Sequence, residues 1–89
     1  MLDFKSVGVG LWRAEFDNLA CYIDQVMPYE RRKRGYFVHW GPTTGRVCDT
    51  LCVGHFDTMP DAEAGALYVL LSYMEQLSKG KILCTQTEQ

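Results

Sequence analysis

The sequence lacks the segments that are typical of exported and membrane-spanning chains. No apolar run reaches the roughly 18 residues that a transmembrane helix needs. The longest candidate, residues 64–71, is interrupted by Ser72 and bounded by Glu63 and Glu75. The first residues, 1–5, do not place a basic segment before an apolar one, as a signal peptide does. We therefore expect a cytoplasmic protein that does not engage a membrane.

Cysteine and histidine do not follow the spacing of a structural zinc site. The chain has 4 cysteines and 2 histidines, but no C-x2-C pair. Cys48, Cys52 and His55 come closest, yet on a strand the two cysteines would stand roughly 13 Å apart at ~3.3 Å per residue. Without an export signal, these cysteines are expected to be thiols. The sequence thus predicts no metal and no cofactor.

No group of residues has the spacing of a catalytic site. Cys48 or Cys52 could approach His39 across a hairpin, but no third residue marks a base-orienting group. The acidic residues in 57–63 cluster at a helix start, where capping explains them. We therefore expect a protein that is not an enzyme. A small thiol or metal enzyme stays open as an alternative, which a reactive Cys48 or Cys52, or zinc that co-purifies, would reveal.

Size and composition indicate one small folded domain. The 89 residues suit a single domain, and 47% hydrophobic content is typical of a folded chain. The 2 Trp, 5 Tyr and 4 Phe are more than one small core can hold. Some aromatic side chains are therefore expected at a surface or an interface, and a homodimer is one way to cover them.

The middle of the chain has the pattern of a β-hairpin. A strand over 36–40 leads through a turn at 43–45 into a second strand over 46–56. Both faces of the second strand carry apolar side chains, which favours a central place in the sheet.

A long helix is predicted from about Pro60 to Ser78. Thr58 and Asp61 resemble a capping box, and Pro60 suits a first turn. Gly80 is expected to end the helix, with 81–89 as a frayed tail. The stripe predicted to be buried consists of large apolar side chains: Leu67, Leu70, Leu71, Met74 and Leu77.

The N-terminal third is more ambiguous. Residues 5–16 alternate with period two and change face near residues 11–12, which predicts one strand containing a bulge. For residues 17–27 we favour a helix capped by Asp17, because Leu19, Tyr22, Ile23 and Val26 fall on one helical face. A second strand is the competing interpretation, since alternate residues in 19–23 are also apolar.

These elements predict an α+β fold of order β-α-β-β-α. The sheet is expected to be small and antiparallel, and to be covered by the helix over 60–78. The whole chain, 1–89, is expected to form this single domain.

Charge is unevenly distributed. Residues 29–46 hold five basic residues against one acidic residue, a net charge of +4. The rest of the chain holds four basic and ten acidic residues, a net charge of −6. One basic corner on an acidic body would orient an encounter with a charged partner.

The basic run of residues 31–34 is the strongest surface feature, and aromatic residues flank it. A protein partner, single-stranded nucleic acid, or no partner at all for a solvated loop would each fit this pattern. The acidic remainder of the chain disfavours nucleic acid, because it would repel a phosphate backbone. We therefore predict a protein-binding patch, with nucleic acid as the alternative, formed by Arg31, Arg32, Lys33, Arg34, Tyr36 and Trp40.

The run Val53–Thr58 and the alanine-rich helix after it resemble a pattern in small phage-encoded inhibitor proteins, including some anti-CRISPR proteins. Those proteins are often single α+β domains of this length. The resemblance covers residues 35–78 and is architectural, so it assigns no functional residue. It implies stoichiometric inhibition of a bacterial defence complex that handles nucleic acid, in the host cytosol.

Overall fold

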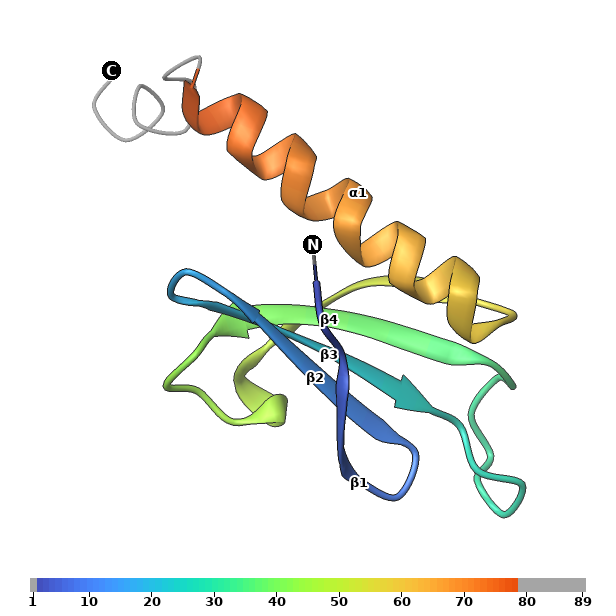
Figure 1. Ribbon diagram of the computed structural model, residues 1–89. Coiled ribbons are helices and arrows are strands. Elements are labelled where there is room, and N and C mark those ends of the chain that lie inside the picture. Colours follow the sequence, from blue (N-terminus) through green and yellow to red (C-terminus); the bar gives the residue numbers. More distant parts are fainter. Residues whose placement is uncertain (1, 79–89) are drawn as a thin grey trace.

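The computed structural model describes residues 2–78, which form a five-stranded antiparallel sheet with one helix on one face (Figure 1). The strands pair in chain order, so each is joined to its neighbour by a hairpin connection. The α+β class, the antiparallel sheet and the covering C-terminal helix are confirmed. The elements are β1 (Lys5–Gly8), β2 (Leu11–Phe16), β3 (Leu19–Gln25), β4 (Tyr36–Pro42), β5 (Leu51–Phe56) and α1 (Met59–Ser78), with a short 3-10 turn η1 (Val47–Asp49) before β5.

The predicted order β-α-β-β-α is wrong in its first half. Residues 5–16 form two strands joined at Val9–Gly10, where Gly10 has a φ of 65°, so the change of face marks a turn and not a bulge within one strand. Asp17 does not cap a helix but takes a φ of 59° in a two-residue turn, because Phe16 pairs directly with Leu19.

The helix expected over 17–27 is β3, the middle strand of the sheet. Both of its faces are covered: Cys21 and Ile23 are fully buried on one face, and Ala20 and Tyr22, which alternate with them, are buried on the other. When a strand carries apolar residues on both faces, some of them also fall at the spacing of one helical face. The apolar pattern of residues 17–27 therefore could not distinguish a helix from a strand.

The core lies between α1 and strands β3 and β4. Ile23 and Val38 are fully buried on the sheet, and they face Ala62 and Ala66 of α1. Because alanine side chains are short, the first half of the helix can approach the sheet closely. Thr58 caps this half, since its Oγ1 accepts a hydrogen bond of 3.2 Å from the Asp61 amide.

The second half of α1 rises away from the sheet (Figure 1). Of the stripe predicted to be buried, Leu70 is buried, but Leu71 is 53% exposed and Met74 is 40% exposed. The prediction assigned large side chains to the buried face of α1, whereas the buried residues described in α1 are Ala62, Ala66 and Leu70, of which two are small. The side chain of Leu77, and the expected helix end and tail after Ser78, lie outside the described residues.

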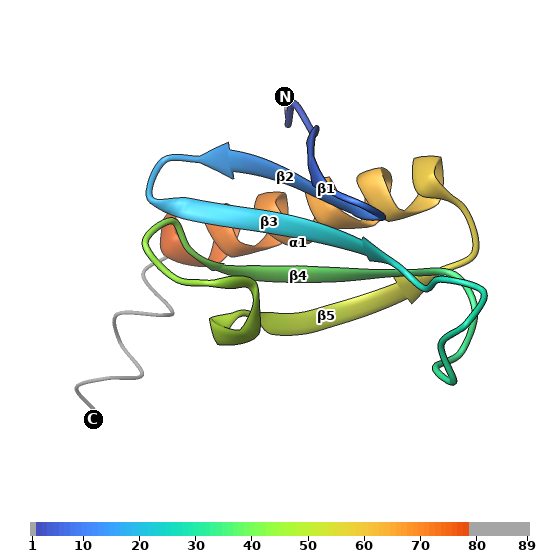
Figure 2. The same ribbon diagram turned by 90° about the horizontal axis from the view of Figure 1, so that it is seen from below.

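Two connections flank the other face of the sheet. One joins β3 to β4 through residues 27–35, and the other joins β4 to β5 through η1 (Figure 2). The turn predicted at 43–45 forms, with the Gly45 amide donating to the Pro42 carbonyl at 3.0 Å. β5 begins five residues later than predicted, at Leu51, and it is an edge strand, not a central one.

Candidate partner-binding surface

The connection over residues 27–35, which we call the basic loop, is held in shape by its own backbone and one carboxylate. The Glu30 side chain accepts a hydrogen bond of 2.8 Å from the Met27 amide, and the Glu30 amide donates to the Met27 carbonyl at 3.0 Å. At the other end, Val26 donates to the Gly35 carbonyl at 2.9 Å. Gly35 has a φ of 125°, which only glycine adopts easily. The loop is therefore a closed turn at one end of the sheet.

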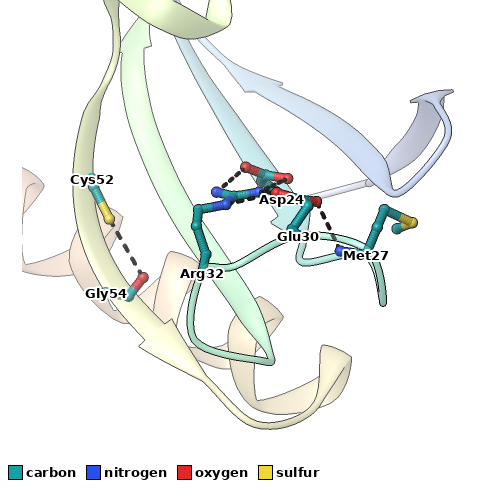
Figure 3. A network of polar contacts seen from close by, with 6 residues as sticks. All are labelled: Asp24, Met27, Glu30, Arg32, Cys52 and Gly54. Carbon is teal, nitrogen blue, oxygen red and sulfur yellow. Dashed lines mark hydrogen bonds and ion pairs between the residues drawn. The ribbon is translucent and has the colours of Figure 1, made fainter.

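Arg32 fixes this loop to the sheet. Its guanidinium lies 2.9 Å from the Asp24 carboxylate of β3 and 2.6 Å from the Glu30 carboxylate, as Figure 3 shows. It also lies 5.5 Å above the ring of Phe37 on β4. The hydrogen bonds that Arg32 donates, first to Asp24 and then to Glu30, raise the pKa of Arg32. The Met27 amide and then Arg32 lower the pKa of Glu30, so both groups stay charged.

The other three cations of the basic run are exposed. Within residues 2–78, no ion pair engages the side chains of Arg31, Lys33 or Arg34. Tyr29, in the same loop, is 83% exposed. The patch predicted from the sequence does not include Tyr29. The loop thus presents three cations and one aromatic ring to solvent on a braced backbone.

The end of the basic loop touches the edge strand. Nε2 of His55 on β5 lies 2.7 Å from the carbonyl oxygen of Arg34. The His55 ring also meets Phe37 edge-on, with the ring centroids 4.6 Å apart. These contacts set the cationic loop beside the C-terminal end of β5.

Tyr36 and Trp40 lie elsewhere. Both pack against the core on the helix side of the sheet, where Tyr36 lies 6.4 Å from Trp12, ring centroid to ring centroid. The Trp40 Nε1 is buried and has no hydrogen-bond partner among the described residues. The structure therefore brings the four basic residues together but separates them from the two aromatic residues of the predicted patch.

Trp40 instead lines an apolar hollow under the second half of α1. This cavity, of about 190 Å³, lies between Leu19 and Trp40 of the sheet and Leu70 and Tyr73 of the helix. A wider hollow continues from it toward the β2–β3 turn, past Phe16 and along Leu70 and Tyr73. The excess of aromatic residues was the only sequence signal for this surface.

The face of the sheet opposite α1 holds polar groups, and some of them are paired with one another. Arg13 donates a hydrogen bond of 3.0 Å to the Tyr22 hydroxyl and lies 5.6 Å over its ring, and it forms an ion pair with Glu15. His39 is a cross-strand partner of Cys52, and burial lowers the pKa of His39.

No group of three or more His, Cys, Asp or Glu side chains that could hold a metal ion occurs in the described range 2–78. No helix in that range is both long enough and apolar enough to cross a bilayer.

Comparison of the chain with protein-family models, with curated proteins and with solved structures gives no match.

Proposed function

We propose that this protein is a non-enzymatic binding protein that acts by occupying the surface of a protein partner, in the cytoplasm. The basic loop is the contact element, with Arg31, Lys33 and Arg34 steering the encounter and Tyr29 as the anchor. Arg32 belongs to the loop but positions it and does not face the partner.

The observation that supports this proposal most is that the four cations of the basic run have different surroundings. One arginine is held by Asp24, Glu30 and Phe37, while its three cationic neighbours have no ion pair in the described part of the chain. A loop that served only solubility would not need this bracing, because a mobile loop keeps its charges in water equally well. A braced loop loses less conformational entropy when a partner binds it.

The charge of the basic loop indicates the sign of the charge on the partner's surface. Three cations favour an acidic protein surface, and the opposite charge on the rest of the chain limits how far a long phosphate backbone could extend. The sheet offers no open stacking platform next to the loop, because Arg32 covers the ring of Phe37. Nucleic acid is therefore the second candidate.

The resemblance to phage-encoded inhibitors extends this proposal to a bacterial defence complex, such as a CRISPR effector, as the target. In that case the positive charge of the basic loop directs the protein to an acidic patch of the effector. A groove that holds nucleic acid is basic and would repel the loop. Inhibition would then come from blocking a moving part or an assembly contact.

Affinity capture from a bacterial lysate tests the proposal. The test variant carries Arg31→Glu and Lys33→Glu. The control carries Lys5→Glu and Arg46→Glu, which change the net charge equally at side chains that are 76% and 82% exposed but lie outside the loop. We expect wild type and control to retain the same protein after nuclease treatment, and the loop variant to lose it.

Equal capture by the loop variant would show that the basic loop is not the contact element. Capture that disappears with nuclease in all samples would instead favour the nucleic-acid alternative. The variant Tyr29→Ala distinguishes steering from anchoring. Loss of the contact that the Tyr29 ring makes in the complex should leave the association rate unchanged and increase the dissociation rate.

A further inference from the structure

The two edges of the sheet differ in how well they are protected. β1 has four residues, carries Lys5 and contains a bulge between Ser6 and Gly8, all of which discourage another strand from pairing with it. β5 has six residues, Leu51 to Phe56, and none of them is Lys, Arg, Asp, Glu or Pro. The edge formed by β5 is therefore longer than that of β1, and it lacks the charged residues and proline that commonly protect an edge.

The outer side of β5 is open. Within residues 2–78 it pairs only with β4, and Figure 2 shows it at the rim of the sheet. Leu51 is 72% exposed there. Backbone amide and carbonyl groups on such an edge can bind an extended segment as an additional strand.

A bulge limits how much of β5 can pair regularly. Val38 pairs with Gly54 while His39 pairs with Cys52, so Val53 is an extra residue in the strand. Gly54–Phe56 is left as the regular stretch next to the basic loop. Three residues supply few hydrogen bonds, so an added strand would need further contacts to bind there.

The basic loop supplies these contacts. The carbonyl oxygen of Arg34 lies 2.7 Å from Nε2 of His55, and Tyr36, the first residue of β4 after the loop, pairs with Phe56. A strand that ran along Gly54–Phe56 and continued past Phe56 would reach the side of the molecule where Arg31, Lys33 and Arg34 are exposed. Acidic residues at that end of the strand would complement them.

We propose that the partner contributes an extended segment that adds to β5 as a sixth strand, with an acidic flank against the basic loop. This inference rests on the proposed function and names the form of its partner. A second copy of this chain fits the edge less well, because antiparallel self-pairing over Gly54–Phe56 would set residues 51–53 of one copy, which carry no acidic side chain, against the basic loop of the other. Antiparallel addition, the commoner arrangement, places the acidic flank at the N-terminal end of the added segment.

Synthetic peptides of about ten residues, the upper end of strand lengths, test this. The first has three acidic residues followed by alternating Val and Thr, and the second carries the same residues in reverse order. The third repeats the first with N-methyl groups at alternate residues, which remove amide donors but keep the charge. Binding is measured with fluorescently labelled peptide, and amide hydrogen exchange is followed residue by residue with NMR.

We expect the first peptide to bind and to slow exchange in β5, and the N-methylated peptide to lose both effects. Arg31→Glu with Lys33→Glu should weaken binding of the first peptide about tenfold, as expected for two exposed ion pairs. Tighter binding of the reversed peptide would overturn the antiparallel orientation.

Equal binding of the N-methylated peptide would overturn strand addition and leave the basic loop as a charge-only contact, so the proposed function would survive. Failure of every acidic peptide to protect β5, or self-association of the chain in sedimentation with β5 protected, would also overturn the inference. The proposed function itself is judged separately, by whether the loop variant loses its captured protein.

Discussion

Arg32 and Asp24 meet at 2.9 Å, and this ion pair ties the most basic stretch of the chain to the middle strand of the sheet. Glu30, within the loop, forms a second ion pair with Arg32. One cation of the basic run thus holds the loop to the sheet, and its three cationic neighbours are exposed. The distinction between Arg32 and Arg31 is the part of the proposal that stability measurements can check directly.

Arg32→Ala should destabilise the protein by about 1–2 kcal/mol, because it removes two exposed ion pairs and a cation–π contact that are each worth up to ~1 kcal/mol. Arg31→Ala, the matched control one residue away, should change the free energy of unfolding by less than about 0.5 kcal/mol. Urea denaturation followed by tryptophan fluorescence measures both. Equal effects of the two changes would show that the Asp24 pair does not brace the loop.

His39 should make stability depend on pH. Burial lowers the pKa of His39 in the folded protein, with Asp24 opposing and Arg32 adding to this shift. The unfolded chain then takes up a proton more readily, so the stabilisation is present above the ordinary pKa of about 6.5 and decreases as pH falls below it. His39→Gln should flatten the decrease between about pH 7.5 and about pH 5.5. His55→Gln is the control that keeps the His39 contribution, and an unchanged slope in His39→Gln would contradict the assignment.

The cysteines should differ sharply in reactivity. Burial raises the pKa of Cys21 to about 12, so its thiolate is scarce at neutral pH, and the side chain is inaccessible. Cys48 and Cys52 are exposed. Alkylation followed by peptide mass spectrometry should label Cys48 and Cys52 in the native protein, and Cys21 only after denaturant is added. Labelling of Cys21 at the rate of Cys52 would mean that β3 opens locally.

The sequence predicted the second half of the fold better than the first, for a physical reason. The hairpin signal around residues 43–45 and the cap at Thr58 are local, and local chemistry decides them. Whether 17–27 is a helix or a strand depends on what covers Ala20 and Tyr22, which are both buried on the side of β3 away from Cys21. That cover comes from residues distant in sequence, so no local pattern reports it.

The candidate site could be predicted only in part, for a similar reason. Clustering of basic residues in sequence places Arg31 to Arg34 in one loop without further information. Which of them pairs with Asp24 depends on the register of β3 against β4, and so does the inward direction of Tyr36 and Trp40. Side chains alternate between the faces of a strand, so one residue of register decides whether an aromatic ring faces a partner or the core.

Substitutions at Leu70 and Leu71 test which face of α1 is buried against the sheet. Both belonged to the stripe predicted to be buried, but Leu70 is 4% exposed and Leu71 is 53% exposed. Leu70→Ala should cost about 2–5 kcal/mol of unfolding free energy, the usual range for a buried leucine. Leu71→Ala should stay within about 0.5 kcal/mol of wild type. Urea denaturation of the two variants measures this, and similar losses for both would mean that α1 is rotated relative to the sheet.

Gly65 should resist replacement by alanine although it lies inside a helix. Alanine favours helix over glycine by ~1 kcal/mol, so an unconstrained site would be stabilised. A Cβ at Gly65 would instead lie 2.8 Å from two ring carbons of Phe56, a side chain packed against the core. Because overpacking costs about 1–3 kcal/mol, Gly65→Ala should leave the protein unchanged or up to ~2 kcal/mol less stable.

A double-mutant cycle separates this clash from helix propensity. In a Phe56→Leu background the side chain at position 56 no longer has ring carbons above Gly65, so the same Gly65→Ala change should become stabilising by up to ~1 kcal/mol. The sign of the Gly65→Ala effect, read from urea denaturation in each background, is the measurement. If Gly65→Ala stabilises the protein with Phe56 in place, the ring is free to move. The close approach of α1 to β5 would then not depend on the absence of a side chain at position 65.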